Sequence, residues 1–345
     1  MHATKPCRPA LLLLALAAVA IPDASGQTAL RSTVLGTVRD TSGAVLVDAR
    51  VTLRGPGLPG GSTTASTNQA GEYRVAGLVP GEFSIRADAA GFTPLVRRAI
   101  LVPLESTVVV DLALEVSGPA DLIEVSVPAP LVDPTASGAP TRLSHAQLTE
   151  LPTSRALADL VNLAPGVGLD VAFGGTRQSN DVRIEGVSLI EPSLGNAWTS
   201  VSYSWLDQAQ VVALGAPAEY TGTTGAITSA VLRSGANVVK GTFEYHFIDE
   251  EWTADNTKAL RAQWGAAARP KTLDVWRDVS GDVGGPVLRD RIWFFGGLQF
   301  GEYAYRGYGF PGPGHTSEER WRALGKLDGA PHQRLRVSGF YQRED

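Results

Sequence analysis

Residues 289–303, RDRIWFFGGLQFGEY, alternate between two kinds of side chain, and this pattern constrains the fold more than any other feature of the chain. The even positions from Ile292 to Phe300 are apolar or glycine, whereas the odd positions are mixed, small and polar. Because successive side chains of a strand point to opposite faces, the stretch predicts a β-strand with one apolar and one mixed face. The question is which surroundings each face meets.

Four further segments after residue 237 alternate in the same way: GTFEYHF, DVWRDVSGDVGGPV, RWRALGKLD and QRLRVSGFYQ. Their apolar positions are Phe243, Tyr245, Phe247, Val275, Val279, Val283, Val287, Trp321, Ala323, Leu327, Leu335, Val337 and Tyr341. The connections alternate between long ones (roughly 249–273, then RGYGFPGPGHTSEE) and short ones (LRD, then DGAP). This rhythm is typical of an outer-membrane β-barrel, whose apolar face meets lipid and whose other face meets a polar lumen. A soluble sandwich also alternates and is the alternative.

The region 33–116 predicts a compact β-sandwich. Short alternating strands recur in DARVTLRG, GEYRV, EFSIRAD and TVVVDLALEV, and turn signals such as DTSG, TNQAG and DAAGF separate them. The side chains expected to point inward are Ala49, Val51, Leu53, Tyr73, Val75, Phe83, Ile85, Ala87, Val108, Val110, Leu112 and Leu114.

Residues 117–140 are rich in Pro, Ala and Ser and predict a linker, within which LIEVSV is a short β-prone island. A small α/β domain is expected over 141–236, with short strands in NDVRIEGVSL, AQVVAL and AITSAVLRSG. It includes a helix with Ser154 as its N-cap. The apolar positions at helical spacing are Leu157, Leu160, Val161 and Ala164.

The N-terminus has the features of a secretory signal peptide. Lys5 and Arg8 precede the apolar run PALLLLALAAVAI, and small residues follow up to a cleavage site near Gly26. A transmembrane anchor is the alternative, but the run is shorter than the ~20 apolar residues that a spanning helix needs. The single cysteine, Cys7, precedes this run. The mature chain is therefore expected to be exported and to contain no thiol.

The composition and motifs give no sign of an enzyme or of a nucleic-acid-binding protein. The net charge is −5, with no basic excess. HTSE (His315–Glu318) matches a zinc-peptidase pair, but only His332 follows, so a solvated polar loop is the expected identity. His145 and His246 are scattered, and glycines in GDVGG (281–285) indicate close packing rather than phosphate binding. We expect no catalytic residue, cofactor or metal.

Two parts of the chain resemble known families. GTVRDTSGAVLVDARVTLRG followed by TNQAGEYRVAGLVPGEFSIRADAAGF looks like a carboxypeptidase regulatory-like domain, a transthyretin-like sandwich. LTELPTSRALADLVNLAPGV, GGTRQSNDVRIEGVSL and SWLDQAQVVALGAPAEYTGTTGAITSAVLRSGAN resemble the plug of a TonB-dependent outer-membrane receptor of the Oar-like kind. VSGDVGGPVLRDRIWFFGGLQFGE resembles the start of its barrel.

The resemblance implies a mainly β chain with five parts. They are a signal peptide (1–26), a transthyretin/Ig-like β-sandwich (33–116), a linker (117–140), a small α/β plug domain (141–236) and the first strands of an incomplete antiparallel transmembrane β-barrel (237–345). It also implies TonB-driven uptake of a ligand across the outer membrane, with sandwich and plug on the periplasmic side. The sequence does not say whether that ligand is a glycan, a peptide or a metal chelate.

In that family TonB grasps a short segment before the plug. Leu122, Ile123, Glu124, Val125, Ser126 and Val127 occupy the matching place. An extended segment in a linker can add as a strand to the sheet edge of a partner, with backbone hydrogen bonds supplying the affinity. A β-prone linker without this role is the alternative.

Five barrel strands depart from the family, whose barrels are much longer. Five strands would leave two open edges in lipid, where unsatisfied backbone groups are costly. We therefore expect the sequence to be the N-terminal part of a longer protein, with a degraded gene as the alternative. The second function that fits is a soluble periplasmic or surface carbohydrate-binding protein built on the sandwich.

Overall fold

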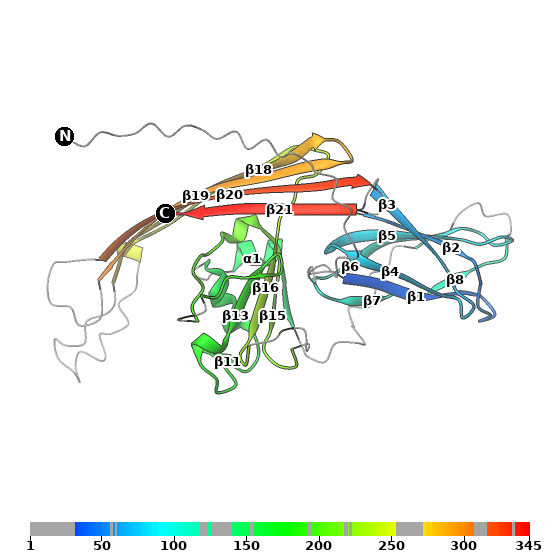
Figure 1. The fold of residues 1–345 in the computed structure, drawn as a ribbon, viewed down its shortest axis with the longest axis horizontal. Coiled ribbons are helices and arrows are strands. Elements are labelled where there is room, and N and C mark those ends of the chain that lie inside the picture. The colour runs from blue at the N-terminus through cyan, green and yellow to red at the C-terminus, as the bar shows by residue number, and fades with distance from the viewer. Residues whose placement is uncertain are drawn as a thin grey trace.

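The computed structural model describes residues 32–55, 58, 61–117, 123–125, 140–151, 155–191, 193, 195–216, 220, 223–252, 272–306, 316–332 and 335–345. These residues form three parts, a β-sandwich, a small α/β unit and a curved sheet (Figure 1). The curved sheet arches over the α/β unit, and the sandwich lies beside both (Figure 1). The chain is mainly β, as expected.

The sandwich consists of two sheets. Its strands are β1 (Ser32–Asp40), β2 (Arg50–Arg54), β3 (Ser62–Ser66), β4 (Glu72–Leu78), β5 (Gly81–Asp88), β6 (Leu95–Val102), β7 (Thr107–Val109), β8 (Leu112–Leu114) and β9 (Ile123–Val125). One sheet has the order β4-β1-β7, with β8 also pairing with β1, and the other has the order β3-β2-β5-β6-β9. Strands β7 and β8 pair in parallel with β1, and β9 pairs in parallel with β6.

The core of the sandwich lies between these sheets and confirms the predicted alternation. All twelve side chains expected to point inward are buried, and Val51, Leu53, Ile85 and Leu114 are fully so. They form one cluster made only of sandwich residues. Burial of alternate residues on each strand therefore holds the sheets together.

One close approach fixes the first sheet where β7 ends and β8 begins. The carbonyl oxygen of Val110 accepts a 2.6 Å hydrogen bond from the buried hydroxyl of Tyr73. Burial, with a further contribution from Asp111, raises the pKa of this phenol, so that it stays protonated and can donate. The same carbonyl presses against Gly36, where a Cβ would lie only 2.0 Å from the oxygen. Only glycine fits there.

The α/β unit contains a five-stranded mixed sheet with the order β10-β15-β16-β13-β14 and a separate β11-β12 pair. Its strands are β10 (Thr141–Ser144), β11 (Val167–Gly168), β12 (Val171–Ala172), β13 (Asp181–Ile184), β14 (Val187–Ser188), β15 (Leu206–Val212) and β16 (Ile227–Leu232). Its helices are α1 (His145–Glu150), η2 (Leu157–Leu163), η3 (Arg177–Ser179) and η4 (Tyr203–Trp205). Among the described residues, no helix is long and apolar enough to cross a membrane.

The predicted helix differs from the observed one in type and start. The segment is a 3-10 helix, η2, that follows Ala156 as N-cap without a side-chain cap, and Ser154 lies outside the described residues. Its apolar positions are buried as expected. The α-helix α1, which was not predicted, starts at a capping box in which Ser144 and Gln147 each bond the other's backbone.

The curved sheet is an antiparallel meander in which each strand pairs with the next. Its strands are β17 (Lys240–Asp249), β18 (Thr272–Leu288), β19 (Ile292–Arg306), β20 (Thr316–His332) and β21 (Leu335–Glu344), and η5 (Glu250–Trp252) follows β17. One predicted turn was wrong, because DGAP lies within β20 and the strand continues to His332. A register irregularity between Gly329 and His332 accommodates the proline there.

The alternation correctly predicted which residues share each face of the curved sheet. On β19 the odd positions Phe295, Gly297 and Gln299 face the α/β unit and are buried. The even positions Leu298 and Phe300 point away from it and are exposed. The same holds for the other strands, whose exposed outward side chains are Phe243, Tyr245, Phe247, Val283, Val287, Trp321, Leu327, Val337 and Tyr341.

The close approach at Gly36 makes a stability prediction. Gly36→Ala should lower the thermal unfolding temperature of the sandwich sharply, because the new methyl group overlaps a backbone carbonyl that cannot move without breaking the Tyr73 bond. The measurement is thermal unfolding followed by circular dichroism.

Gly43→Ala is the control, because a Cβ there meets nothing within 4 Å although φ is +93°. It should cost only the strain of that backbone conformation, on the order of 1 kcal/mol. Equal losses in the two variants would mean that the packing at Gly36 is not what constrains this sheet.

Candidate functional site

The contact between the α/β unit and the concave face of the curved sheet is polar and buried. The sheet residues that face the unit include seven polar side chains with at most 9% exposure, and they are Asp278, Ser280, Asp282, Gln299, Arg322, Lys326 and Asp328. Buried charges are tolerated only when they are paired and hydrogen-bonded. Their partners therefore define how the unit is held.

Lys326 on β20 is the centre of one group of contacts. Its Nζ lies 2.6 Å from Glu185 Oε1 and donates to the carbonyl of Leu232 at 3.1 Å. Glu185 sits in the turn between β13 and β14 and also accepts from the Leu232 backbone N–H at 2.9 Å. Asp328 on the same strand places its carboxylate 3.9 Å from the ammonium group. One lysine thus joins the sheet to the β13–β14 turn and to the end of β16.

Two arginines of the α/β unit contact the first two strands of the curved sheet, β17 and β18. Arg155 Nη2 lies 2.8 Å from Glu244 Oε2 on β17, and only 6% of the arginine side chain is exposed. Arg233 Nη1 donates to both carboxylate oxygens of Asp282 on β18, each at 3.0 Å. Close to that pair, the hydroxyls of Ser204 and Ser280 are 3.3 Å apart.

The last strand contributes uncharged as well as charged contacts. Glu344 accepts from the Thr199 hydroxyl at 2.9 Å and from Arg322 Nη2 at 2.8 Å. Gln342 donates to the carbonyl of Ser200 at 2.6 Å. Strands β17, β18, β20 and β21 are therefore all bonded to the unit, which fixes it against most of the width of the sheet.

An apolar patch completes the contact at β19. Phe295 and Leu324 of the curved sheet belong to the same buried cluster as Trp205 and the rest of the core of the unit. The indole of Trp205 lies over Gly297, where a Cβ would be 2.4 Å from Nε1. A side chain at this position would displace the tryptophan, so the glycine of the mixed face serves close packing.

Two glycines of GDVGG, Gly284 and Gly285, also serve close packing, as predicted, whereas a Cβ on Gly281 would meet its nearest atoms only at 3.9 Å. A Cβ on Gly285 would lie 2.8 Å from Cγ2 of Val239. The backbone at Gly235 passes so close to this strand that a Cβ on Gly235 would lie 2.6 Å from the carbonyl oxygen of Gly285.

Burial also changes the pKa of a carboxyl group on the α/β unit. Burial raises the pKa of Asp207, while the positive charges of His145, Lys326 and Arg233 act in the opposite direction. The carboxylate thus sits beside the cations that bind Glu185 and Asp282, and the site is a mixed charge cluster rather than a cluster of one sign.

The predicted TonB-binding segment lies elsewhere, on the sandwich. Ile123, Glu124 and Val125 form β9, whose backbone pairs in parallel with Leu95–Arg97 of β6. Leu122, Ser126 and Val127 lie outside the described residues. The assignment of this segment to TonB stays a prediction.

The described part of the chain contains no group of three or more His, Cys, Asp or Glu residues that could hold a metal ion. His315 of the HTSE match lies outside it. The predicted polar loop was wrong for the rest of the match, because Thr316, Ser317 and Glu318 begin strand β20, and Glu318 pairs with Arg320. His145 bonds the backbone carbonyl of Leu206, and His246 lies against Glu244.

The sequence alone does not identify Lys326 and its partners as site residues. The available signal was a lysine and an aspartate on the inward phase of RWRALGKLD, which predicts a charged contact but does not name Glu185 as the partner.

Removing the ammonium group should loosen the unit. Lys326→Met leaves the Glu185 carboxylate without its cation and the Leu232 carbonyl without the lysine donor, and breaking a buried pair by removing one partner costs roughly 3–5 kcal/mol. Hydrogen exchange of peptides covering 181–188 and 227–232 should accelerate at least about tenfold, which corresponds to ~1.4 kcal/mol.

Arg320→Gln is the matched control, because it breaks an exposed ion pair with Glu318 on the same strand. Exposed pairs are worth ~1 kcal/mol or less. The double variant Lys326→Met/Glu185→Gln should recover part of the lost protection, since a neutral amide then replaces the Glu185 carboxylate. Equal exchange in the Lys326 and Arg320 variants would contradict the assigned role.

Comparison with known proteins agrees with this architecture. Residues 33–115 match the family model described as a carboxypeptidase regulatory-like domain. The chain is 27% identical over 292 residues to the TonB-dependent transporter Oar of Myxococcus xanthus. The match covers 79% of this chain and 27% of that protein, so the chain spans about a quarter of the length of its relative.

Solved structures give weaker likenesses. The outer membrane transporter YddB of Escherichia coli is 16% identical with a TM-score of 0.44, over 58% of this chain and 32% of that one. A catechol 1,2-dioxygenase of Acinetobacter radioresistens is 12% identical with a TM-score of 0.22, over 29% of this chain and 58% of that one. Both TM-scores are below 0.5, so neither likeness bears on function. The chain carries a carboxypeptidase regulatory-like domain and, over most of its length, is homologous to a TonB-dependent transporter.

Proposed function

We propose that the protein is a TonB-dependent transporter of the outer membrane. In this proposal β17–β21 begin the wall of a barrel, the α/β unit is the plug that occupies its lumen, and TonB acts on Leu122–Val127 from the periplasm. The N-terminal run ending near Gly26 directs export. The ligand is taken up when the plug moves.

The opposed faces of the curved sheet are the observation that carries this proposal. The concave face places buried charges against the α/β unit, whereas the convex face exposes large apolar side chains such as Phe243 (75%) and Leu298 (67%). A soluble sheet would not leave so continuous an apolar face in water. The same face in a bilayer is stable, because hydrocarbon then covers it.

The polar contact suits a plug that must move. The groups of salt bridges such as Lys326–Glu185 and Arg155–Glu244 can exchange their partners for water when the contact opens. An apolar contact of the same area would expose hydrophobic surface to water, which is unfavourable. Homology to a TonB-dependent transporter supports the same reading.

The pairing of β9 with β6 adds a step to the coupling between TonB and the plug. Three residues of the proposed TonB-binding segment already pair with β6, so one edge of their backbone is occupied by the sandwich. The other edge of β9 is the open end of the sheet β3-β2-β5-β6-β9. Parallel pairing over so few residues is weak. Tension from TonB would therefore detach β9 from β6 before it reaches the plug.

A proline in the segment should abolish coupling. Val125→Pro removes a backbone N–H and disfavours strand addition, so cross-linking of the protein to TonB in membranes should fall to background. The control is Ala136→Pro, elsewhere in the stretch between sandwich and plug. If the Val125→Pro variant is correctly inserted in the outer membrane and still cross-links to TonB, the assignment of the segment is refuted.

Recovery of the unaltered protein in the soluble fraction without detergent would refute the proposal that it is a transporter.

Locking β9 onto β6 should block transport reversibly. Val96 and Glu124 are register partners, and the only cysteine of the chain, Cys7, belongs to the predicted signal peptide. In the variant Val96→Cys/Glu124→Cys, oxidation should abolish the TonB-dependent movement of the plug. The measurement is the sensitivity of the α/β unit to proteolysis. A reductant should restore the movement. Each single-cysteine variant is the control. Unchanged response in the oxidised double variant would show that β9 need not leave the sandwich.

A further inference from the structure

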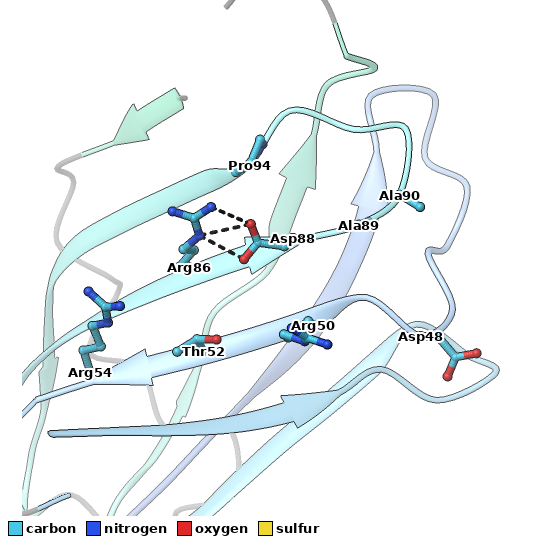
Figure 2. Close-up of a pocket in the computed structure, with 9 residues that line it drawn as sticks. All are labelled: Asp48, Arg50, Thr52, Arg54, Arg86, Asp88, Ala89, Ala90 and Pro94. Atoms are coloured by element: carbon cyan, nitrogen blue, oxygen red, sulfur yellow. Dashed lines mark hydrogen bonds and ion pairs between the residues drawn. The ribbon is translucent and has the colours of Figure 1, made fainter. Parts of the chain in front are cut away.

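The outer face of the sheet β3-β2-β5-β6 carries a depression of about 590 Å³ lined by three arginines. Arg50, Thr52 and Arg54 point outward from β2, and Arg86 is the register partner of Thr52 on β5 (Figure 2). The volume lies in the range of sites that bind small molecules or segments of polymers. Nothing in the plug or the curved sheet lines this depression.

Three arginines and two aspartates, Asp48 and Asp88, line the depression, and their charges are not balanced pair by pair. Asp88 is the register partner of Arg50, yet it bonds Arg86 two residues earlier on its own strand, with Nε and Nη2 donating at 2.8–3.0 Å. Figure 2 shows this pair turned toward each other, while Arg50 and Arg54 stand apart on β2. No hydrogen bond or ion pair within the described ranges involves the guanidinium of Arg50 or of Arg54.

Packing of the sandwich does not explain these arginines. Like charges on neighbouring positions of a sheet face repel each other, and the three arginines surround a single threonine. The chain as a whole is acidic, with a net charge of −5, so the cluster is not part of a generally basic surface. Arginines that lack a carboxylate partner and line a depression are available to bind an anion.

The spacing of the arginines limits the ligand. Arg50 and Arg54 are four residues apart on one strand, which places their Cα atoms ~13 Å apart. The two side chains stand apart on β2 (Figure 2), so a single carboxylate or phosphate that binds one guanidinium in the bidentate manner leaves the other guanidinium free for a second anionic group. The two sites together therefore fit a ligand with at least two anionic groups.

We propose that this face of the sandwich binds a polyanion, a chain with repeated carboxylate or phosphate groups, through Arg50 and Arg54. The Thr52 hydroxyl between them lies 3.4 Å from the Thr64 hydroxyl, and Asp88 holds Arg86 in place beside it. The residues that line the depression include no aromatic side chain on which a neutral sugar ring could pack. The site thus differs from the carbohydrate site that was the alternative for the sandwich.

Titration of the full chain in detergent with defined probes tests this proposal. Short-chain polyphosphate and poly-γ-glutamate distinguish phosphate from carboxylate, inorganic phosphate tests a single anion, and dextran tests a neutral glycan. We expect at least one polyanion to bind, inorganic phosphate to bind at least about tenfold more weakly, and binding to weaken with salt.

The variant Arg50→Gln/Arg54→Gln should reduce polyanion affinity by about tenfold or more. Arg39→Gln/Arg74→Gln is the charge-matched control, because it removes two exposed arginines from the other sheet, and it should change the affinity by less than about twofold. Equal weakening by the two variants would mean attraction by net charge only and would overturn the site. Binding of dextran, or of no polyanion at low salt, would overturn it as well. None of these outcomes depends on TonB.

Discussion

The curved sheet has two faces that require different surroundings, and the rest of the structure depends on this constraint. Its concave face buries ionised groups such as Asp282 and Lys326, which can be kept out of water only beside partners of opposite charge. The α/β unit supplies those partners from Arg233 and Glu185. Its convex face exposes large apolar side chains on all five strands, with no covering element among the described residues. The position of the α/β unit therefore follows from the chemistry of the wall against which it packs.

The α/β unit in turn does not have a complete core of its own. Its buried cluster includes Phe295 and Leu324 from the curved sheet, and Trp205 packs on the bare backbone of Gly297. The unit also touches the sandwich, because Gln208 and Gln210 of β15 bond Leu104 and Glu105 in the loop after β6. Strand β15 thus lies in a continuous set of contacts from the sandwich to the wall. Such continuity is a physical condition for force at one end to reach the other.

The sandwich contributes two different surfaces from one sheet. The last strand of this sheet is β9, so that three residues of the segment proposed for TonB, Ile123–Val125, are paired within a folded domain. Its outer face carries the arginine cluster around Thr52, on strands that do not touch β9. An edge offers backbone hydrogen bonds and a face offers side-chain charge, so the two surfaces suit partners of different chemistry. The core of the sandwich is independent of the other parts, which fits a domain that can be added to a transporter.

The sequence by itself determined which face each strand residue would occupy. The alternation of two residues follows from strand geometry, so the exposed Leu298 and the buried Gln299 could be assigned without a structure, as could the inward residues of the sandwich. A local signal for α1 was also present in Ser144 and Gln147, because a capping box spans only a few residues. Tertiary structure alone decided the partners of the buried charges. Lys326 and Glu185 are 141 residues apart, and many other carboxylates were equally available to the lysine in the sequence. It also decided that β9 would pair with β6, and that Gly297 would be covered by Trp205. These choices depend on packing between elements that are distant in the chain, and local periodicity contains no information about that packing.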